Sequence, residues 1–64
     1  MKNNFRMIIA ERKLSMKKIE RDTGISYSTL SRLKREEGEN PDIRHLITLA
    51  KYFNIGLDDL IEIE

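Results

Sequence analysis

The 64-residue chain has no cysteine, no tryptophan, one proline and three glycines. The absence of cysteine excludes disulfides, thiol catalysis and thiolate metal sites, and it is compatible with a reducing compartment. The longest apolar run, residues 7–10, is far too short for a signal sequence or a membrane span. We therefore expect a soluble, cytoplasmic protein. A chain of this length has room for one domain, covering 1–64, with a small hydrophobic core.

Residues that commonly carry chemistry are also scarce. His45 is the only histidine, and one imidazole without cysteine or a paired carboxylate beside it indicates no metal site. No serine, histidine and carboxylate have a spacing that indicates a catalytic triad. The sequence therefore predicts a protein that is not an enzyme and needs no cofactor or metal, and nothing in it indicates a membrane or small-molecule partner.

The formal net charge is only +1, but the charges are unevenly distributed along the chain. Residues 1–35 hold ten Lys and Arg against three acids, a balance of +7. Residues 36–64 hold two against eight acids, a balance of −6. Such a chain can turn its basic half toward the phosphates of a nucleic acid while the acidic half stays away. The alternative is that both blocks are solvated helix faces of a highly charged small protein.

Apolar side chains recur with helical spacing along most of the chain, which predicts an all-α bundle of four to five short helices. The first helix is expected from about Asn4 to Lys13, and the fourth follows a loop at about 36–41 with Asp42 as its N-cap. The apolar stripe of the fourth helix is predicted to comprise Ile43, Leu46, Ile47, Ala50 and Phe53. A last helical turn or short fifth helix follows, and residues 61–64 alternate like a fragment of edge strand.

The segment 16–35 predicts two short helices joined by a tight turn at Gly24. Glycine readily takes the φ > 0 backbone conformation that ends many helices. Ser15 and Ser26 each precede a helical pattern, where a serine hydroxyl caps a free N–H group of the first turn. Each serine is also flanked by apolar residues at the spacing of a hydrophobic staple. Helix, turn, helix is therefore the simplest interpretation.

This segment resembles the helix-turn-helix of the Cro/CI (XRE-type) DNA-binding family, which includes phage repressors. The matching residues are Ser15, Ile19, Thr23, Gly24, Ile25, Ser26, Ser28, Thr29, Leu30, Ser31, Arg32 and Leu33. The likeness continues to residue 60 and covers nearly the whole chain. It implies a lambda-repressor-like fold whose partner is double-stranded DNA. It further implies a sequence-specific transcriptional regulator, a repressor of phage or mobile-element type, that reads the major groove with a helix at about 26–35.

By this resemblance, Tyr27, Ser28 and Arg32 hold the base-reading positions. Arg32 can bond O6 and N7 of one guanine together, which is worth about 1 to 3 kcal/mol of discrimination. Two alternatives remain open: Arg32 is a solvated helix arginine, and Tyr27 is a surface aromatic packed on the preceding helix.

Contacts to the DNA backbone are expected from Lys17, Lys18, Thr29 and Arg35, because cations and helix N-termini both attract phosphates. Taken singly, each lysine is better explained by simple solvation. The prediction depends on the residues lying together at one edge of one motif.

Several residues depart from the family pattern. Met16 stands where a glutamine is frequent, and Glu20 stands where a small alanine usually lets the two helices approach. We expect Glu20 to bend outward or the helix crossing to open slightly. Ile9 and Lys34 replace a partly buried arginine and glutamate pair, and losing both avoids leaving one buried charge unpaired. The loop at 36–39 is acidic where relatives are often basic.

Useful DNA affinity normally needs two half-sites and hence a homodimer. The candidate interface is formed by the C-terminal apolar residues Leu57, Leu60, Ile61 and Ile63, which alternatively close a small core. A rival function is a protein-binding module of the same fold, an antirepressor or antitoxin component without DNA binding. The departures at Met16 and Glu20 and the acidic loop favour this rival.

Overall fold

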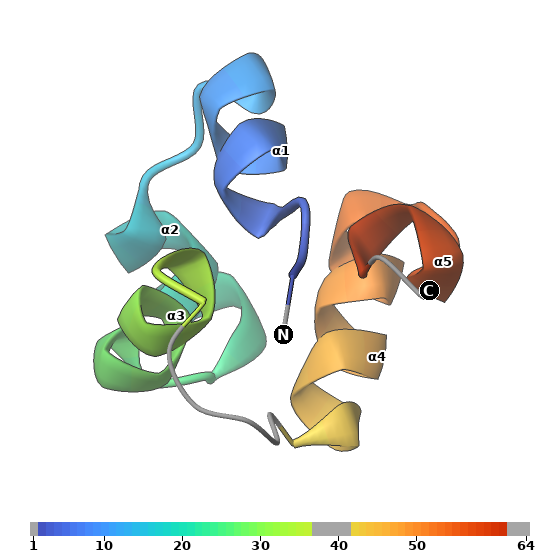
Figure 1. The fold of residues 1–64 in the computed structure, drawn as a ribbon. Coiled ribbons are helices and arrows are strands. Elements are labelled where there is room, and N and C mark those ends of the chain that lie inside the picture. The colour runs from blue at the N-terminus through green and yellow to red at the C-terminus, as the bar shows by residue number, and fades with distance from the viewer. Residues whose placement is uncertain (1, 37–41, 62–64) are drawn as a thin grey trace.

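The computed structural model describes residues 2–36 and 42–61, which form five helices around one hydrophobic core (Figure 1). The helices are α1 (Phe5–Arg12), α2 (Met16–Thr23), α3 (Tyr27–Lys34), α4 (Ile43–Phe53) and α5 (Leu57–Leu60). Figure 1 shows α2 and α3 side by side on one flank, α4 and α5 together on the other, and α1 at the top of the view. The predicted all-α bundle is therefore confirmed. No described helix is long and apolar enough to cross a membrane.

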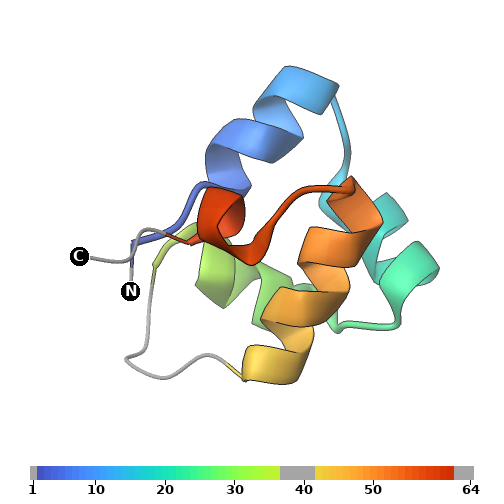
Figure 2. The same ribbon diagram turned by 90° about the vertical axis from the view of Figure 1, so that its right-hand side faces the viewer.

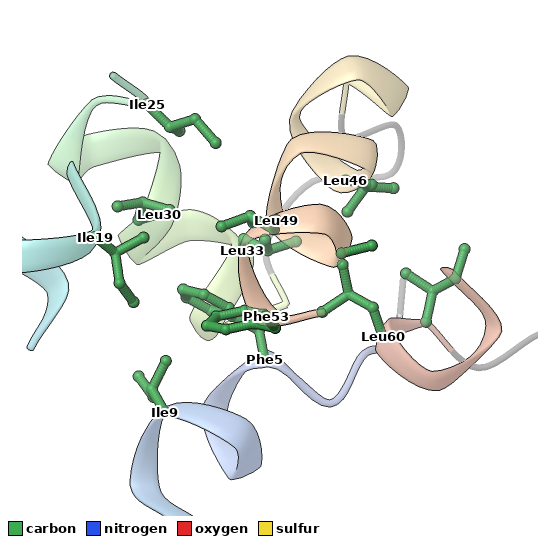
Figure 3. Packing of buried hydrophobic residues seen from close by; sticks show 12 residues of the cluster. Phe5, Ile9, Ile19, Ile25, Leu30, Leu33, Leu46, Leu49, Phe53 and Leu60 are labelled. Atoms are coloured by element: carbon green, nitrogen blue, oxygen red, sulfur yellow. The ribbon is translucent and has the colours of Figure 1, made fainter. Parts of the chain in front are cut away.

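The core draws buried apolar side chains from every helix. Its members are Phe5, Ile9, Ile19, Ile25, Leu30, Leu33, Leu46, Leu49, Ala50, Phe53, Leu60 and Ile61. The rings of Phe5 and Phe53 lie at its centre (Figure 3). Their centroids are 6.0 Å apart. Helices of only eight residues, such as α1 to α3, are marginal in water on their own. Shared burial against the core therefore holds them in place.

The buried face of α4 differs from the predicted stripe. Leu46, Ala50 and Phe53 are buried as expected, but Leu49 is fully buried as well. Ile43 and Ile47 are instead 51% and 42% exposed. The observed set has the spacing i, i+3, i+4, i+7, which is also a regular helical stripe, so periodicity alone could not distinguish the two faces. The prediction that Ile43 and Ile47 face the core is therefore wrong.

The two ends of the described chain meet beside α5. The backbone N–H of Asn4 donates to the carbonyl of Leu60 at 2.7 Å, and Asn3 forms an isolated antiparallel bridge with Ile61. Figure 2 shows the first described residues running next to the turn of α5. The side-chain amide of Asn3 also donates to the carbonyl of Leu33 at 3.0 Å. The N-terminal segment thus connects the end of α3 to α5.

This junction changes the interpretation of the C-terminal apolar residues. Leu60 is fully buried and Ile61 is 8% exposed, while the half-buried Leu57 packs against the core. Leu60 and Ile61 therefore close the core, and their assignment to a dimer surface is corrected. Ile63, most of the predicted loop and most of the predicted edge strand lie outside the described residues.

Candidate nucleic-acid interface

The predicted caps position the two helices of the motif. The hydroxyl of Ser15 accepts a hydrogen bond from the N–H of Lys18 at 3.1 Å, and that of Ser26 accepts one from the N–H of Thr29 at 3.2 Å. Gly24 ends α2 with φ +79°, the left-handed conformation that glycine adopts without steric cost. Both N-caps and the glycine turn are therefore confirmed as predicted.

Thr23 adds a second constraint on the turn. Its hydroxyl donates to the carbonyl of Ile19 at 2.7 Å and accepts from the N–H of Ile25 at 3.2 Å. Ile19 and Ile25 are buried on either side of the turn, and Leu30 is buried from α3 (Figure 3). The direction of α3 relative to α2 is therefore fixed by polar bonds in the turn and by apolar burial beneath it.

The three predicted base-reading residues lie on the solvent side of α3. Leu30 and Leu33 are buried, so α3 presents its other side outward. Ser28 and Arg32 are exposed one helical turn apart, and Tyr27 at the first position of the helix is 47% exposed. Within residues 2–36 and 42–61, no hydrogen bond or ion pair engages the guanidinium of Arg32. Its donors therefore remain available to a ligand.

The predicted phosphate-binding residues differ in whether their side chains already bond to other residues of the chain. Lys17 is exposed and forms no ion pair within the described part of the chain, whereas the ammonium of Lys18 lies 3.4 Å from the carboxylate of Asp22. Thr29 accepts a hydrogen bond from the Ser26 hydroxyl at 2.8 Å, so the Thr29 hydroxyl keeps its own proton for donation. Arg35 is exposed at the end of α3.

Asp22 connects α2 to α4 through a tyrosine. The hydroxyl of Tyr52 donates to the Asp22 carboxylate at 2.7 Å. This hydrogen bond, followed by those from Lys18 and the charge of Arg21, holds the pKa of Asp22 below its ordinary value of 3.8. A carboxyl whose pKa is lowered by folding stabilises the folded state above its ordinary pKa. That contribution is lost as pH falls from about 3.8 through the lowered value.

Removing the tyrosine hydroxyl is expected to weaken this pH dependence. In Tyr52→Phe we expect the pKa of Asp22 to rise toward 3.8, because the hydrogen bond that lowers this pKa most is removed. The stability of the variant should then fall less steeply as the solution is acidified below that pH. An NMR titration of the Asp22 carboxyl carbon measures the change. Tyr27→Phe is the matched control, since the Tyr27 hydroxyl makes no hydrogen bond within the described residues. An unchanged Asp22 pKa in Tyr52→Phe contradicts the assignment.

Glu20 adopts a position that the sequence did not indicate. The residue is half-buried as a whole, and its carboxylate accepts a solvent-exposed hydrogen bond from the backbone N–H of Tyr27, with Oε2 at 2.6 Å from the nitrogen. The side chain therefore turns toward the first turn of α3 instead of bending outward. The only sequence signal was an acceptor seven residues before a helix start, which is too common to be informative alone.

Comparison with known proteins identifies the family of this motif. A family model described as the Cro/C1-type HTH DNA-binding domain matches residues 4–64. The chain belongs to this family. It is similar to two curated proteins named as uncharacterized HTH-type transcriptional regulators, one of Rickettsia prowazekii (strain Madrid E) and one of Rickettsia conorii (strain ATCC VR-613 / Malish 7).

Each of these relatives is 40% identical over 60 residues, a match that covers 81% of this chain. The match covers 65% of the Rickettsia prowazekii protein and 55% of the Rickettsia conorii protein. The chain therefore spans less than two thirds of their length. No solved structure shows a significant match.

Two departures from the Cro/C1-type pattern, at Met16 and Ile9, are accommodated by apolar packing. Met16 is half-buried and packs against the core, so a thioether occupies the place of the frequent glutamine. Ile9 is 6% exposed and belongs to the core, while Lys34 is half-buried. A buried isoleucine carries no charge that needs a partner. The motif is thus complete in its backbone but lacks a side-chain amide at position 16.

Metal ligands do not gather in this Cro/C1-type domain as far as the structure describes it. Within residues 2–36 and 42–61, no group of three or more His, Cys, Asp or Glu side chains could hold a metal ion. The chemistry available at the exposed face of α3 is that of hydrogen bonding and positive charge.

Proposed function

We propose that this Cro/C1-type chain is a sequence-specific transcriptional regulator, a repressor of phage or mobile-element type acting in the cytoplasm, that reads the major groove with α3. The observation that carries the proposal is the exposed face of Tyr27, Ser28 and Arg32 on a helix whose other side is fixed in the core. An arginine with free donors on such a helix suits the two acceptors of a guanine edge. The names of the Rickettsia relatives support a role in transcription.

The distribution of charge supports the same orientation toward DNA. The basic residues lie mainly in the segment that forms α1 to α3, whereas Asp58 and Asp59 lie in the first turn of α5. Lys17 and Thr29 can contact phosphates without breaking an interaction. Lys17 has no ion pair within the described residues, and the Thr29 hydroxyl keeps a proton to donate. Lys18 must share its ammonium with Asp22, so we assign it a weaker contact. Arg35 extends the basic surface to the end of α3.

Selection from random double-stranded DNA tests this function. The purified chain is incubated with a pool of randomised duplexes, and bound duplexes are amplified and sequenced over several rounds. We expect enrichment of one motif, with binding that weakens steeply as salt rises, as phosphate contacts require. Failure to bind or enrich any duplex contradicts the proposal and favours the rival protein-binding module.

We further propose that the chain acts on DNA as a homodimer. The longest dimension of the molecule is 30 Å, whereas the half-sites of helix-turn-helix operators lie about 34 Å apart, so one copy cannot occupy both. Leu60 and Ile61 are unavailable in the core. We place the contact at Ile43 and Ile47, exposed apolar residues one turn apart on α4.

Ile47→Asp is expected to convert the dimer to a monomer without unfolding it, because a charge on an exposed face disfavours self-association but needs no burial. Sedimentation equilibrium of both proteins, alone and with the selected duplex, measures the change. Circular dichroism checks that the variant stays helical. A parent chain that is monomeric at every concentration and binds the duplex as a single copy contradicts the dimer.

A further inference from the structure

The carboxylate of Glu20 reaches from α2 to the first residue of α3. The distance of 2.6 Å between Oε2 and the nitrogen of Tyr27 is that of a short, charge-assisted hydrogen bond. The contact crosses the turn that separates the two helices and lies at the solvent-exposed surface, although the Glu20 residue as a whole is half-buried. It is thus a direct bond between the helix that supports the motif and the helix that carries the reading face.

The first turn of α3 needs such partners. The first N–H groups of a helix have no acceptor within the helix itself. Ser26 accepts from the N–H of Thr29, and Glu20 accepts from the N–H of Tyr27. Ser26 lies directly before α3, whereas Glu20 lies in α2. The two acceptors together therefore hold the start of α3 both to its own cap and to the preceding helix. Tyr27 and Ser28, two of the proposed base-reading residues, lie in this turn.

Attraction to DNA does not explain an acid in this place. A carboxylate beside a DNA-binding face repels phosphates and therefore adds no affinity of its own. Its contribution to binding would have to be geometric, through the turn that it holds. Arg32 lies one turn further along α3, where the N–H groups find acceptors within the helix, and depends less on this contact.

We propose that Glu20 is a positioning residue for DNA readout, a role that rests on the function proposed above. Its carboxylate holds the N–H of Tyr27 and so orients Tyr27 and Ser28 toward base edges. The hydrogen-bond acceptor carries this role; the negative charge strengthens the bond but is not itself needed for readout. Glu20→Gln keeps an acceptor at the same reach, whereas Glu20→Ala removes it.

Hydrogen exchange tests the contact without DNA. In Glu20→Ala we expect the amide of Tyr27 to exchange about tenfold faster than in the parent chain, because a hydrogen bond to a charged group is lost. In Glu20→Gln we expect most of the protection to return. The amide of Lys18, which Ser15 caps at the start of α2, is the internal control and should be unchanged. Equal exchange of the Tyr27 amide in all three proteins overturns the proposal.

Base preference tests the role in readout. With the duplex selected by the parent chain, each base pair is varied in turn and binding is measured for the three proteins. Glu20→Ala should lose about tenfold in preference at the base pairs read by Tyr27 and Ser28, and keep its preference at the base pair read by Arg32. Glu20→Gln should match the parent in preference at every base pair and bind random duplexes at least as tightly.

Failure of the Glu20 role and failure of the proposed function give different results. If the parent selects a motif and Glu20→Ala keeps every preference, Glu20 has no positioning role and the proposed function stands. If Glu20→Gln loses preference as Glu20→Ala does, the charge matters and the acceptor role is wrong. If the parent selects no motif, both the function and the readout role of Glu20 are wrong, even where exchange detects the hydrogen bond.

Discussion

Arg32→Ala should lose about 1 to 3 kcal/mol of binding free energy on the selected duplex and much less on random DNA. The guanidinium is exposed on α3 and has no partner within the described residues, so its removal leaves the fold unchanged. The variant should also accept other bases at one position of each half-site. Fluorescence anisotropy at fixed salt, with selected and random duplexes, measures both effects.

Lys17→Ala is the matched control for Arg32→Ala, because Lys17 is also an exposed cation without an ion pair in the described part of the chain. A residue that holds a phosphate carries no sequence information. We therefore expect Lys17→Ala to weaken all duplexes about equally and to lower the salt slope by about one. If Arg32→Ala behaves in the same way, Arg32 contacts only the DNA backbone and the reading face is misassigned.

Leu60→Asp should unfold the chain or come close to it. Leu60 is fully buried in α5, and the carbonyl of Leu60 accepts the N–H of Asn4 where the chain ends meet. The substitution removes a core side chain and places a charge without a partner in its place. These effects together are expected to cost about 4 kcal/mol or more, a large part of the stability of so small a domain. Urea unfolding followed by far-UV circular dichroism measures the loss.

Ile47→Asp provides the comparison, since the same new charge is placed at a side chain that is 42% exposed. At a protein concentration where the parent chain is monomeric, its free energy of unfolding should change by less than about 1 kcal/mol. A Leu60→Asp protein that is folded and as stable as Ile47→Asp contradicts the burial of α5. It would restore the C-terminal residues as candidates for a dimer surface.

The features that follow from short-range rules could be predicted from the sequence. Ser15, Gly24 and Ser26 act within one helical turn of themselves, so the residue type and its neighbours decide the cap or turn. The outward face of α3 follows in the same way, since burial of Leu30 and Leu33 leaves Ser28 and Arg32 on the other side. The roles of these exposed residues in DNA binding come from family resemblance and stay a prediction.

The features that depend on distant partners could not be predicted. Ile43 and Ile47 fit a helical stripe as well as Leu49 does, and only the packing of α4 against the other helices decides which are buried. Leu60 is buried in the core where α5 packs against α4, and its carbonyl bonds to Asn4 from the opposite end of the chain. The bond between Glu20 and Tyr27 likewise depends on how α2 and α3 cross. Sequence periodicity indicates the apolar stripes of single helices but does not predict how the helices and chain ends pack against one another.

Reading of a guanine by Arg32 is tested most directly by replacing each guanine of the selected duplex, one at a time, with 7-deazaguanine. This base lacks the N7 acceptor and keeps normal pairing. We expect one replacement in each half-site to weaken the parent chain about tenfold, and the same replacement to have no effect on Arg32→Ala, because the lost acceptor and the lost donor belong to one contact. Equal weakening of both proteins at every guanine, or no weakening of either, would contradict a base-reading role for α3.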